Sequence, residues 1–133
     1  MPDFRQVTDT LWVSPQISLE DVAAAKALGV ALIINNRPDG EELGQPAGAQ
    51  IEAAARNAGL SYVAIPVAGR PQAAQVEAMQ AALAPGARTL AYCRSGTRSI
   101  MTWALGRAAT DDKDDLLRRG AAAGYDLSMV LGN

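Results

Sequence analysis

Two kinds of hydrophobic pattern alternate along the chain. Short segments that carry β-branched, aromatic or other apolar residues lie between turn-favouring residues and predict strands at residues 4–7, 11–13, 30–34, 61–65 and 88–92. Other segments repeat their apolar residues at helical spacing and predict helices between Ser18 and Gly29, at about residues 49–58, 71–83, 96–108 and 126–131, and after a cap at Thr110. Ser18 with Asp21 has the spacing of a capping box.

Strands that alternate with helices of this length are typical of an α/β fold. They predict a mainly parallel sheet of four to five strands, with helices on both faces. Functional residues of such sheets collect at the carboxyl ends of the strands. The segments that follow strands are residues 35–42, 66–70 and 93–98. No repeat or linker divides the chain, so we expect a single domain over residues 1–133.

The composition argues against several classes of function. The formal net charge is -2, with a sequence pI near 5.0, which disfavours nucleic acid and anionic membranes as partners. No apolar stretch reaches the length of a membrane span and no secretory leader is recognisable, so we expect a cytoplasmic protein. One cysteine and no histidine exclude an intrachain disulfide and disfavour a metal site. We expect no cofactor.

The segment after the strand at 88–92 carries the candidate chemistry. It must turn sharply into a helix, and Gly96 permits the positive φ or close backbone approach that such a turn needs. Amide groups in this turn, with the start of the next helix, would bind an oxyanion and favour the thiolate of Cys93. Arg98 would pair two oxygens of that anion. The other members of the anion-binding loop would be Arg94, Ser95, Gly96, Thr97 and Ser99.

Polar residues after the strand at 30–34 are candidates for supporting roles. The side chains of Asn35 and Asn36 are predicted to hydrogen-bond the backbone of the cysteine loop. The charged residues that follow are predicted to form a solvated loop that contains Arg37. If that loop folds over the cysteine, a carboxyl group on it would serve as a general acid. The candidates are Asp39, Glu41 and Glu42.

The motif CRSGTRS resembles the active-site loop of rhodanese sulfurtransferases. With one residue fewer between cysteine and arginine, it also resembles the phosphate loop of cysteine-dependent protein phosphatases. The segments LWVSPQIS, LGVALIINNRPDGEE and LSYVAIPV resemble dual-specificity phosphatase domains. Over about residues 6–106 the combination is similar to a bacterial family called beta-lactamase-hydrolase-like. That resemblance implies a protein-tyrosine-phosphatase-like fold, a sulfur-transferase role and, because members occur fused to one, a metallo-hydrolase partner.

Two departures from the phosphatase pattern shape the functional hypothesis. Tyr92 stands where phosphatases usually have histidine, and residues 68–70 read Ala-Gly-Arg where an acidic residue is expected. An alkoxide leaving group needs a proton, whereas sulfite expelled from thiosulfate does not. The main hypothesis is therefore sulfur transfer through a Cys93 persulfide, from thiosulfate or a persulfide to a thiol acceptor or cyanide. The alternatives are hydrolysis of a phosphate ester through a cysteinyl phosphate, and a non-catalytic anion-binding or docking domain.

Overall fold

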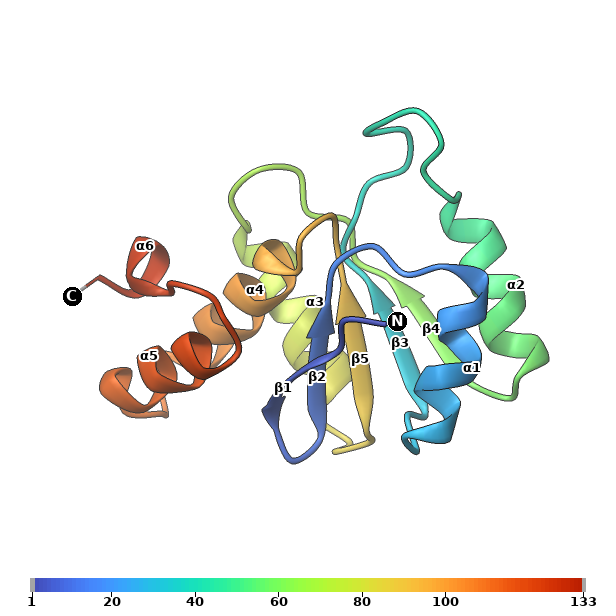
Figure 1. Cartoon of the computed structure of the whole chain (residues 1–133). Coiled ribbons are helices and arrows are strands. Elements are labelled where there is room, and N and C mark those ends of the chain that lie inside the picture. The colour runs from blue at the N-terminus through green and yellow to red at the C-terminus, as the bar shows by residue number, and fades with distance from the viewer. Residues whose placement is uncertain (1, 133) are drawn as a thin grey trace.

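A five-stranded sheet organises residues 2–132, the part of the chain that the computed structural model describes (Figure 1). The strand order is β1-β2-β5-β3-β4. β1 is antiparallel to β2, and the remaining neighbours are parallel. The mainly parallel α/β sheet predicted from the sequence is thus confirmed. The strands are β1 (Arg5–Thr8), β2 (Leu11–Ser14), β3 (Leu32–Asn35), β4 (Ser61–Ala64) and β5 (Thr89–Tyr92).

Helices cover both faces of the sheet. In Figure 1, α1 and α2 lie on one side and α3 and α4 on the other, while α5 and α6 extend beyond α4. The helices are α1 (Leu19–Ala27), α2 (Gly48–Asn57), α3 (Ala73–Leu83), α4 (Thr97–Arg107), α5 (Lys113–Ala122) and α6 (Ser128–Leu131). None of the helices between residues 2 and 132 has the length and apolar character needed to cross a membrane.

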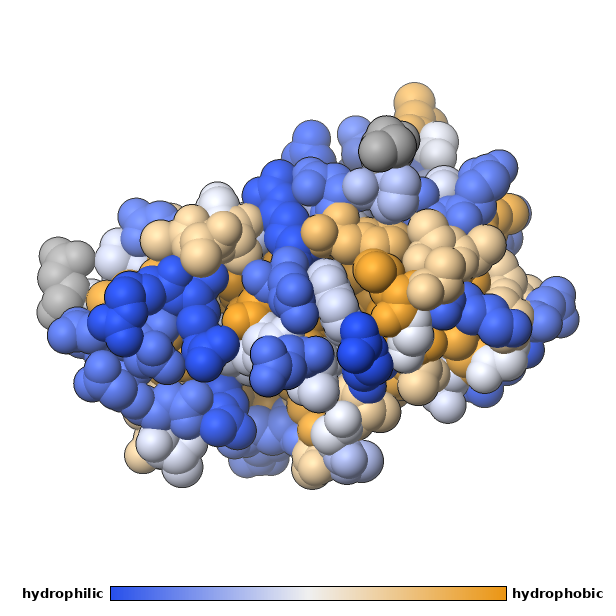
Figure 2. Space-filling view, turned by 60° about the horizontal axis from the view of Figure 1, so that its bottom comes forward, coloured by the Kyte–Doolittle hydropathy of each residue, from blue (hydrophilic) through white to orange (hydrophobic). Residues whose placement is uncertain are grey.

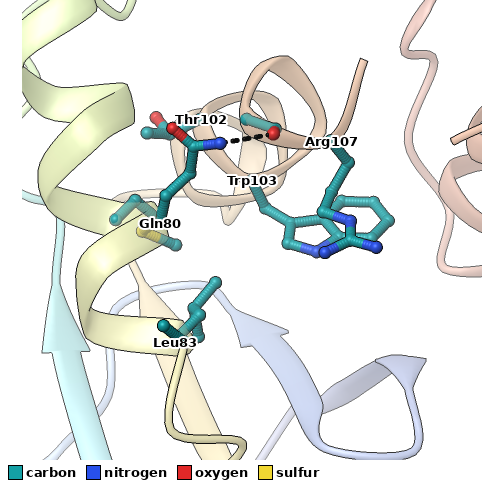
Figure 3. A pocket seen from close by; sticks show the side chains of 8 residues that line it. Gln80, Leu83, Thr102, Trp103 and Arg107 are labelled. Atoms are coloured by element: carbon teal, nitrogen blue, oxygen red, sulfur yellow. Dashed lines mark hydrogen bonds between the residues drawn. The ribbon is translucent and has the colours of Figure 1, made fainter. Parts of the chain in front are cut away.

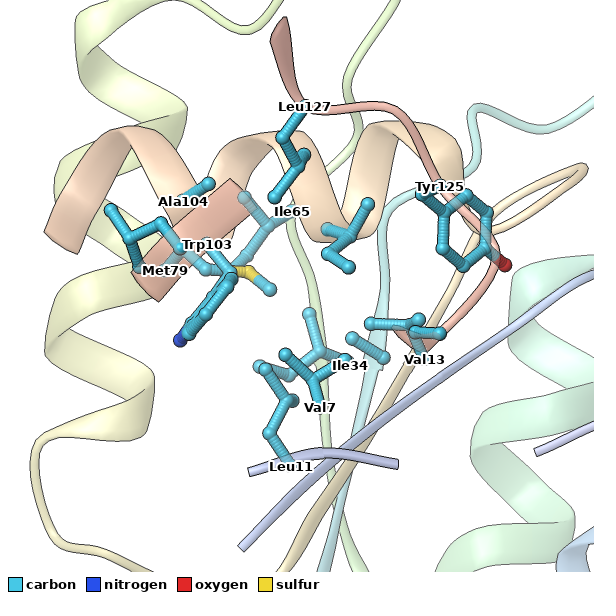
Figure 4. Close-up of a cluster of buried hydrophobic side chains, with 14 residues drawn as sticks. Val7, Leu11, Val13, Ile34, Ile65, Met79, Trp103, Ala104, Tyr125 and Leu127 are labelled. Atoms are coloured by element: carbon cyan, nitrogen blue, oxygen red, sulfur yellow. The ribbon is translucent and has the colours of Figure 1, made fainter. Parts of the chain in front are cut away.

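Each central strand buries side chains on both faces. On β5, Leu90 and Tyr92 pack in the core beneath α1 and α2, whereas Ala91 packs in the opposite core. Ile33 and Ile34 of β3 divide in the same way. This alternation follows from the two-residue period of a strand. Figure 4 shows the second core, where side chains of the sheet meet α3, α4 and the C-terminal segment.

Local signals placed the bounds of most elements within two residues, but the cap of α5 was predicted at the wrong residue. Ser18 caps α1 and forms the predicted box, because its hydroxyl accepts from Asp21 N–H while the Asp21 carboxylate accepts from Ser18 N–H. The predicted cap at Thr110 is wrong. Asp112 caps α5 instead, and Thr110 stays in the preceding turn, where its N–H donates to the carbonyl of Arg107.

The end of the sheet away from the loops after β3 and β5 has a mixed surface. Figure 2 shows hydrophilic side chains over the α5 side and hydrophobic ones toward the α1 side. Leu28, at the end of α1, is one of the large apolar side chains exposed on this protein. The concentration of charged groups considered below lies at the opposite end of the sheet.

Candidate active site

Loops that follow four strands meet at the carboxyl edge of the sheet. The loop after β5 is bound to the loop after β2, because Gln16 N–H donates to the Arg94 carbonyl at 3.2 Å. The loop after β3 contacts the loop after β4, because Val67 N–H donates to the Asn36 carbonyl at 2.9 Å. Arg98 joins these pairs, since its Nη1 lies 2.7 Å from the Val67 carbonyl. The segments expected to lie together from the sequence do so.

The backbone of the cysteine loop turns its carbonyl groups to one side and some of its N–H groups to the other. Its carbonyl groups are occupied from outside: that of Arg94 by Gln16 N–H, and that of Ser95 by the Tyr125 hydroxyl at 2.8 Å. A planar trans peptide directs its N–H opposite to its carbonyl, so the amides of Ser95 and Gly96 point to the other side. Within residues 2–132, the N–H groups of Ser95 and Arg98 have no acceptor. They remain available to an oxyanion at the start of α4.

Cys93 lies at the base of this loop and is fully buried. The Gly96 N–H donates to Cys93 Sγ at 3.1 Å, with Gly96 at φ +92°. An inert core cysteine would lie among apolar groups, whereas a hydrogen bond from a backbone amide stabilises negative charge on this sulfur. The arrangement supports the role predicted for Cys93 and Gly96, and the ionisation of the thiol remains a prediction.

Arg98 binds the two flanking loops and lies beside the sulfur. Its Nη1 and Nη2 donate to the two carboxylate oxygens of Glu41 at 2.7 and 2.8 Å. The pKa of Arg98 is raised, chiefly by the hydrogen bond to Glu41, and a thiolate at the nearby Cys93 would raise it further. The side chain is 16% exposed. The guanidinium predicted to bind an anion therefore contacts the carboxylate of Glu41, and its binding of a substrate anion stays a prediction.

The loop between β3 and α2 is anchored by a buried arginine. Asp39, Glu41 and Glu42 are exposed, as predicted for a solvated loop, whereas that prediction is wrong for Arg37. The side chain of Arg37 is 1% exposed. Its guanidinium donates to Glu41 at 3.0 Å, to Glu42 at 3.0 Å and to the side-chain oxygen of Gln16 at 3.1 Å. These partners cover every nitrogen of the guanidinium, and they hold the loop over the entrance to the cysteine loop.

The carboxyl groups considered as general acids occupy different places. Glu41 bridges Arg98 and Arg37, and these hydrogen bonds, that from Arg98 being the stronger influence, lower its pKa from 4.5 to about 2. In this arrangement Glu41 is a carboxylate at neutral pH. Glu42 lies at the rim, bound to Arg37. Asp39 is directed elsewhere, because it accepts from Gly48 N–H at the start of α2.

The asparagines do not contact the cysteine loop as predicted. Asn35 accepts from the N–H of Arg37 and donates to the Tyr62 hydroxyl, so it shapes its own loop. Asn36 donates through its side chain to the Ile65 carbonyl, and only its backbone N–H reaches β5, at the Tyr92 carbonyl. The predicted side-chain support is wrong, because each amide finds a nearer partner in its own or the neighbouring loop.

The remaining loop residues surround the entrance and the start of α4. Arg94 is well exposed, and with Glu41, Glu42 and Arg98 it lines a hollow of about 350 Å³. The hydroxyls of Ser95 and Thr97 bond to each other at 2.9 Å. Ser99 is fully buried, and its hydroxyl has no partner among residues 2–132. Side chains of both signs thus frame the opening.

A second hollow lies between α3 and α4, away from the cysteine loop. It measures about 300 Å³ and is lined by side chains that include Leu83, Trp103 and Arg107, as Figure 3 shows. The side chain of Gln80 donates to the Gly106 carbonyl at 2.7 Å and links the two helices there. None of its lining residues belongs to the Cys93 loop, so the candidate chemistry remains at the carboxyl edge of the sheet.

Known sequences and structures agree with this geometry. Residues 3–110 match the family model of the beta-lactamase hydrolase-like protein, phosphatase-like domain. A beta-lactamase hydrolase-like protein of Xylella fastidiosa is 38% identical over 132 residues, covering 94% of this chain and 30% of the relative. One from Agrobacterium fabrum is 35% identical, covering 92% and 29%. The chain therefore spans less than a third of the length of these relatives.

Solved structures share the same architecture. A candidate phosphatase from Neisseria meningitidis has a TM-score of 0.85 at 36% identity, covering 97% of this chain and 94% of that one. A candidate phosphatase from Shewanella putrefaciens has a TM-score of 0.75 at 23% identity, covering 98% and 89%, which shows the fold alone. The phosphatase-like fold implied by the sequence motifs is confirmed. The chain belongs to the phosphatase-like domain family of the beta-lactamase hydrolase-like proteins.

Proposed function

We propose that this domain hydrolyses phosphate monoesters through a cysteinyl phosphate on Cys93. The observation that carries the proposal is the hydrogen bond from Gly96 N–H to a cysteine sulfur beside Arg98, with further loop amides that have no acceptor among residues 2–132. A phosphoryl group placed there would meet a nucleophile and positive groups together. The matched family model is described as phosphatase-like, and the Neisseria meningitidis structure is described as a candidate phosphatase; these descriptions favour hydrolysis over the sulfur transfer that the sequence resemblance implied.

The reaction has two displacement steps. In the first, the Cys93 thiolate attacks phosphorus, an S–P bond forms, and the ester O–P bond breaks with its electron pair on the departing oxygen. In the second, water attacks the same phosphorus, the S–P bond breaks, and inorganic phosphate leaves while the thiolate is restored. The loop amides and the guanidinium of Arg98 would stabilise the charge on the equatorial oxygens in both steps.

The leaving group restricts the substrate class. With Glu41 bound to two guanidinium groups and its pKa lowered to about 2, it does not supply a proton at neutral pH. Esters whose departing oxygen is a weak base, such as aryl phosphates, depart without an acid more readily than alkyl phosphates. A protein of the same fold from Pseudomonas aeruginosa, TpbA, has been solved in complex with phosphotyrosine. Aryl phosphates are therefore the substrates to test first.

Sulfur transfer is the second candidate, and one observation favours it. Glu41 is ion-paired and Asp39 faces α2, which leaves a site suited to a leaving group that departs as a stable anion, such as sulfite. In that reaction Cys93 would accept the outer sulfur of thiosulfate as a persulfide. The acceptor would be a thiol.

Two measurements separate the candidates. Hydrolysis of an aryl phosphate is followed with the parent protein and with Cys93→Ser, and intact mass is measured after incubation with thiosulfate. The proposal predicts turnover that Cys93→Ser abolishes, with no gain of sulfur. Uptake of one sulfur atom on Cys93 without ester hydrolysis would reverse the order of the candidates. Binding of inorganic phosphate with neither reaction would leave a non-catalytic anion-binding domain.

A further inference from the structure

The peptide bond between Ser95 and Gly96 is held at both ends. Its N–H donates to Cys93 Sγ at 3.1 Å, and its carbonyl accepts from the Tyr125 hydroxyl at 2.8 Å. Since a trans peptide is planar and its carbonyl and N–H point in opposite directions, holding one group orients the other. Within residues 2–132 the Ser95 carbonyl has no other donor. The tyrosine hydroxyl is thus the contact that fixes where this N–H points.

Tyr125 itself is held independently of the loop. Its ring packs at the edge of the core, and Figure 4 shows its hydroxyl directed away from the other apolar side chains. The guanidinium of Arg5 lies 5.0 Å from the ring centre and also donates to the Ala123 carbonyl at 3.4 Å. Burial raises the pKa of Tyr125, so the hydroxyl keeps its proton and remains a donor at neutral pH. Contacts outside the cysteine loop therefore fix the position of the Tyr125 ring.

Gly96 allows the close approach of the Tyr125 hydroxyl, and the flexibility of glycine makes a restraint at this point necessary. A Cβ at Gly96 would collide with the Tyr125 hydroxyl, so only glycine allows the approach. Glycine also populates positive and negative φ with similar ease, and it would let the peptide rotate if nothing held the carbonyl. Rotation would turn a carbonyl oxygen rather than an N–H toward the sulfur. The flexible residue next to Cys93 therefore needs an external restraint.

We infer that Tyr125 is a positioning residue for Cys93: its hydroxyl holds the peptide between Ser95 and Gly96 with the N–H on the sulfur, and so favours the thiolate. Tyr125 lies outside residues 3–110, where the family model matches. The inference rests on the proposed role of Cys93 as nucleophile. Because it concerns only the ionisation of the thiol, it holds whether Cys93 attacks phosphorus or sulfur.

The test compares two Tyr→Phe variants, each of which loses one tyrosine hydroxyl. Tyr125→Phe keeps the ring in the core and removes the bond to Ser95, whereas Tyr62→Phe removes a hydroxyl that accepts from Asn35 at 3.0 Å. Cys93 is the only cysteine, so thiolate absorbance in the ultraviolet reports it alone. Each variant is titrated against the same variant carrying Cys93→Ser, which subtracts the tyrosines. Urea unfolding establishes that both variants are folded.

The inference predicts that Tyr125→Phe raises the pH of half-ionisation of Cys93 by about 0.5 to 1, the effect of losing one hydrogen bond. Tyr62→Phe leaves that pH unchanged. An unchanged titration in Tyr125→Phe, with lower resistance to urea, would reduce Tyr125 to a packing role and overturn the inference. A shifted titration in a protein that hydrolyses no ester would instead refute the proposed function and keep the role of Tyr125.

Discussion

Glu41 occupies the guanidinium that the proposed substrate needs, which makes Glu41→Gln an informative substitution. The carboxylate binds both terminal nitrogens of Arg98 at 2.7 and 2.8 Å, the same two-point contact that phosphate oxygens make with arginine. An oxyanion must therefore displace Glu41 or share its partner. Glutamine keeps the size of the side chain but removes the negative charge, so an incoming oxyanion should displace it from the Arg98 guanidinium more readily.

The size of the effect follows from the ion pair. Lowering the pKa of Glu41 from 4.5 to about 2 corresponds to about 3.4 kcal/mol in favour of the carboxylate. The side chain is 28% exposed, and water screens such pairs until they contribute at most about 1 kcal/mol. Removing about 1 kcal/mol of competing ion-pair energy predicts that the Glu41→Gln variant binds a tetrahedral oxyanion roughly fivefold more tightly than the parent protein does.

Calorimetric titration with tungstate measures this difference directly. The matched control is Glu52→Gln, because Glu52 forms an ion pair with Arg56 at 2.8 Å on the surface of α2, outside the hollow at the cysteine loop. Glu52→Gln should bind tungstate as the parent protein does. If Glu41→Gln binds the anion no better than the control, or binds it more weakly, Glu41 holds Arg98 in position and the competition argument fails.

The same site yields further expectations. Because the pKa of Glu41 is lowered in the folded state, its stabilising contribution is present above pH 4.5 and declines as pH falls toward about 2; urea unfolding should show this loss in the parent protein and not in Glu41→Gln. Arg37→Met removes charged hydrogen bonds from a buried side chain, so the free energy of unfolding should fall by about 2 kcal/mol and protease should cut residues 38–47 faster; unchanged cleavage would contradict the anchoring role. Gly96→Ala, at φ +92° against the Tyr125 hydroxyl, should cost about 1–3 kcal/mol in urea unfolding and lower turnover. Ser99→Ala deletes a buried hydroxyl that has no partner in the described part of the chain, so stability should stay within about 0.5 kcal/mol or rise; a larger loss would reveal an interaction of that hydroxyl.

The sequence was sufficient for features that depend on local patterns. Alternating burial on β3 and β5 follows from apolar runs with few polar interruptions, and the capping box at Ser18 needs only residues 18 and 21. The cysteine loop was recognisable because a sharp turn, an amide-rich helix start and an arginine are encoded within one short segment. The meeting of several loops at one edge follows from parallel strands.

Contacts between distant residues could not be predicted in this way. Arg37 looks like a surface residue in a polar segment, and its burial depends on Gln16, which belongs to the loop after another strand. Tyr125 lies 30 residues beyond Ser95 and carries no motif that points to the loop. Asn35 and Asn36 had suitable chemistry, but nearer acceptors decided where their amides bond. Side-chain competition at close range was the missing information.

The proposed reaction at this site would depend on the leaving group more than on the nucleophile. Cys93, the loop amides and Arg98 would serve phosphoryl and sulfur transfer equally, because both require a thiolate beside a bound anion. The carboxyl group nearest to Arg98 is committed to ion pairs, so the departing group must tolerate leaving without a proton. Plotting the rate of hydrolysis against the basicity of the departing phenol should therefore give a steep dependence, because charge develops on that oxygen without neutralisation. A flat dependence would require a proton donor at the departing oxygen, and Glu42 at the rim would then be the side chain to replace first.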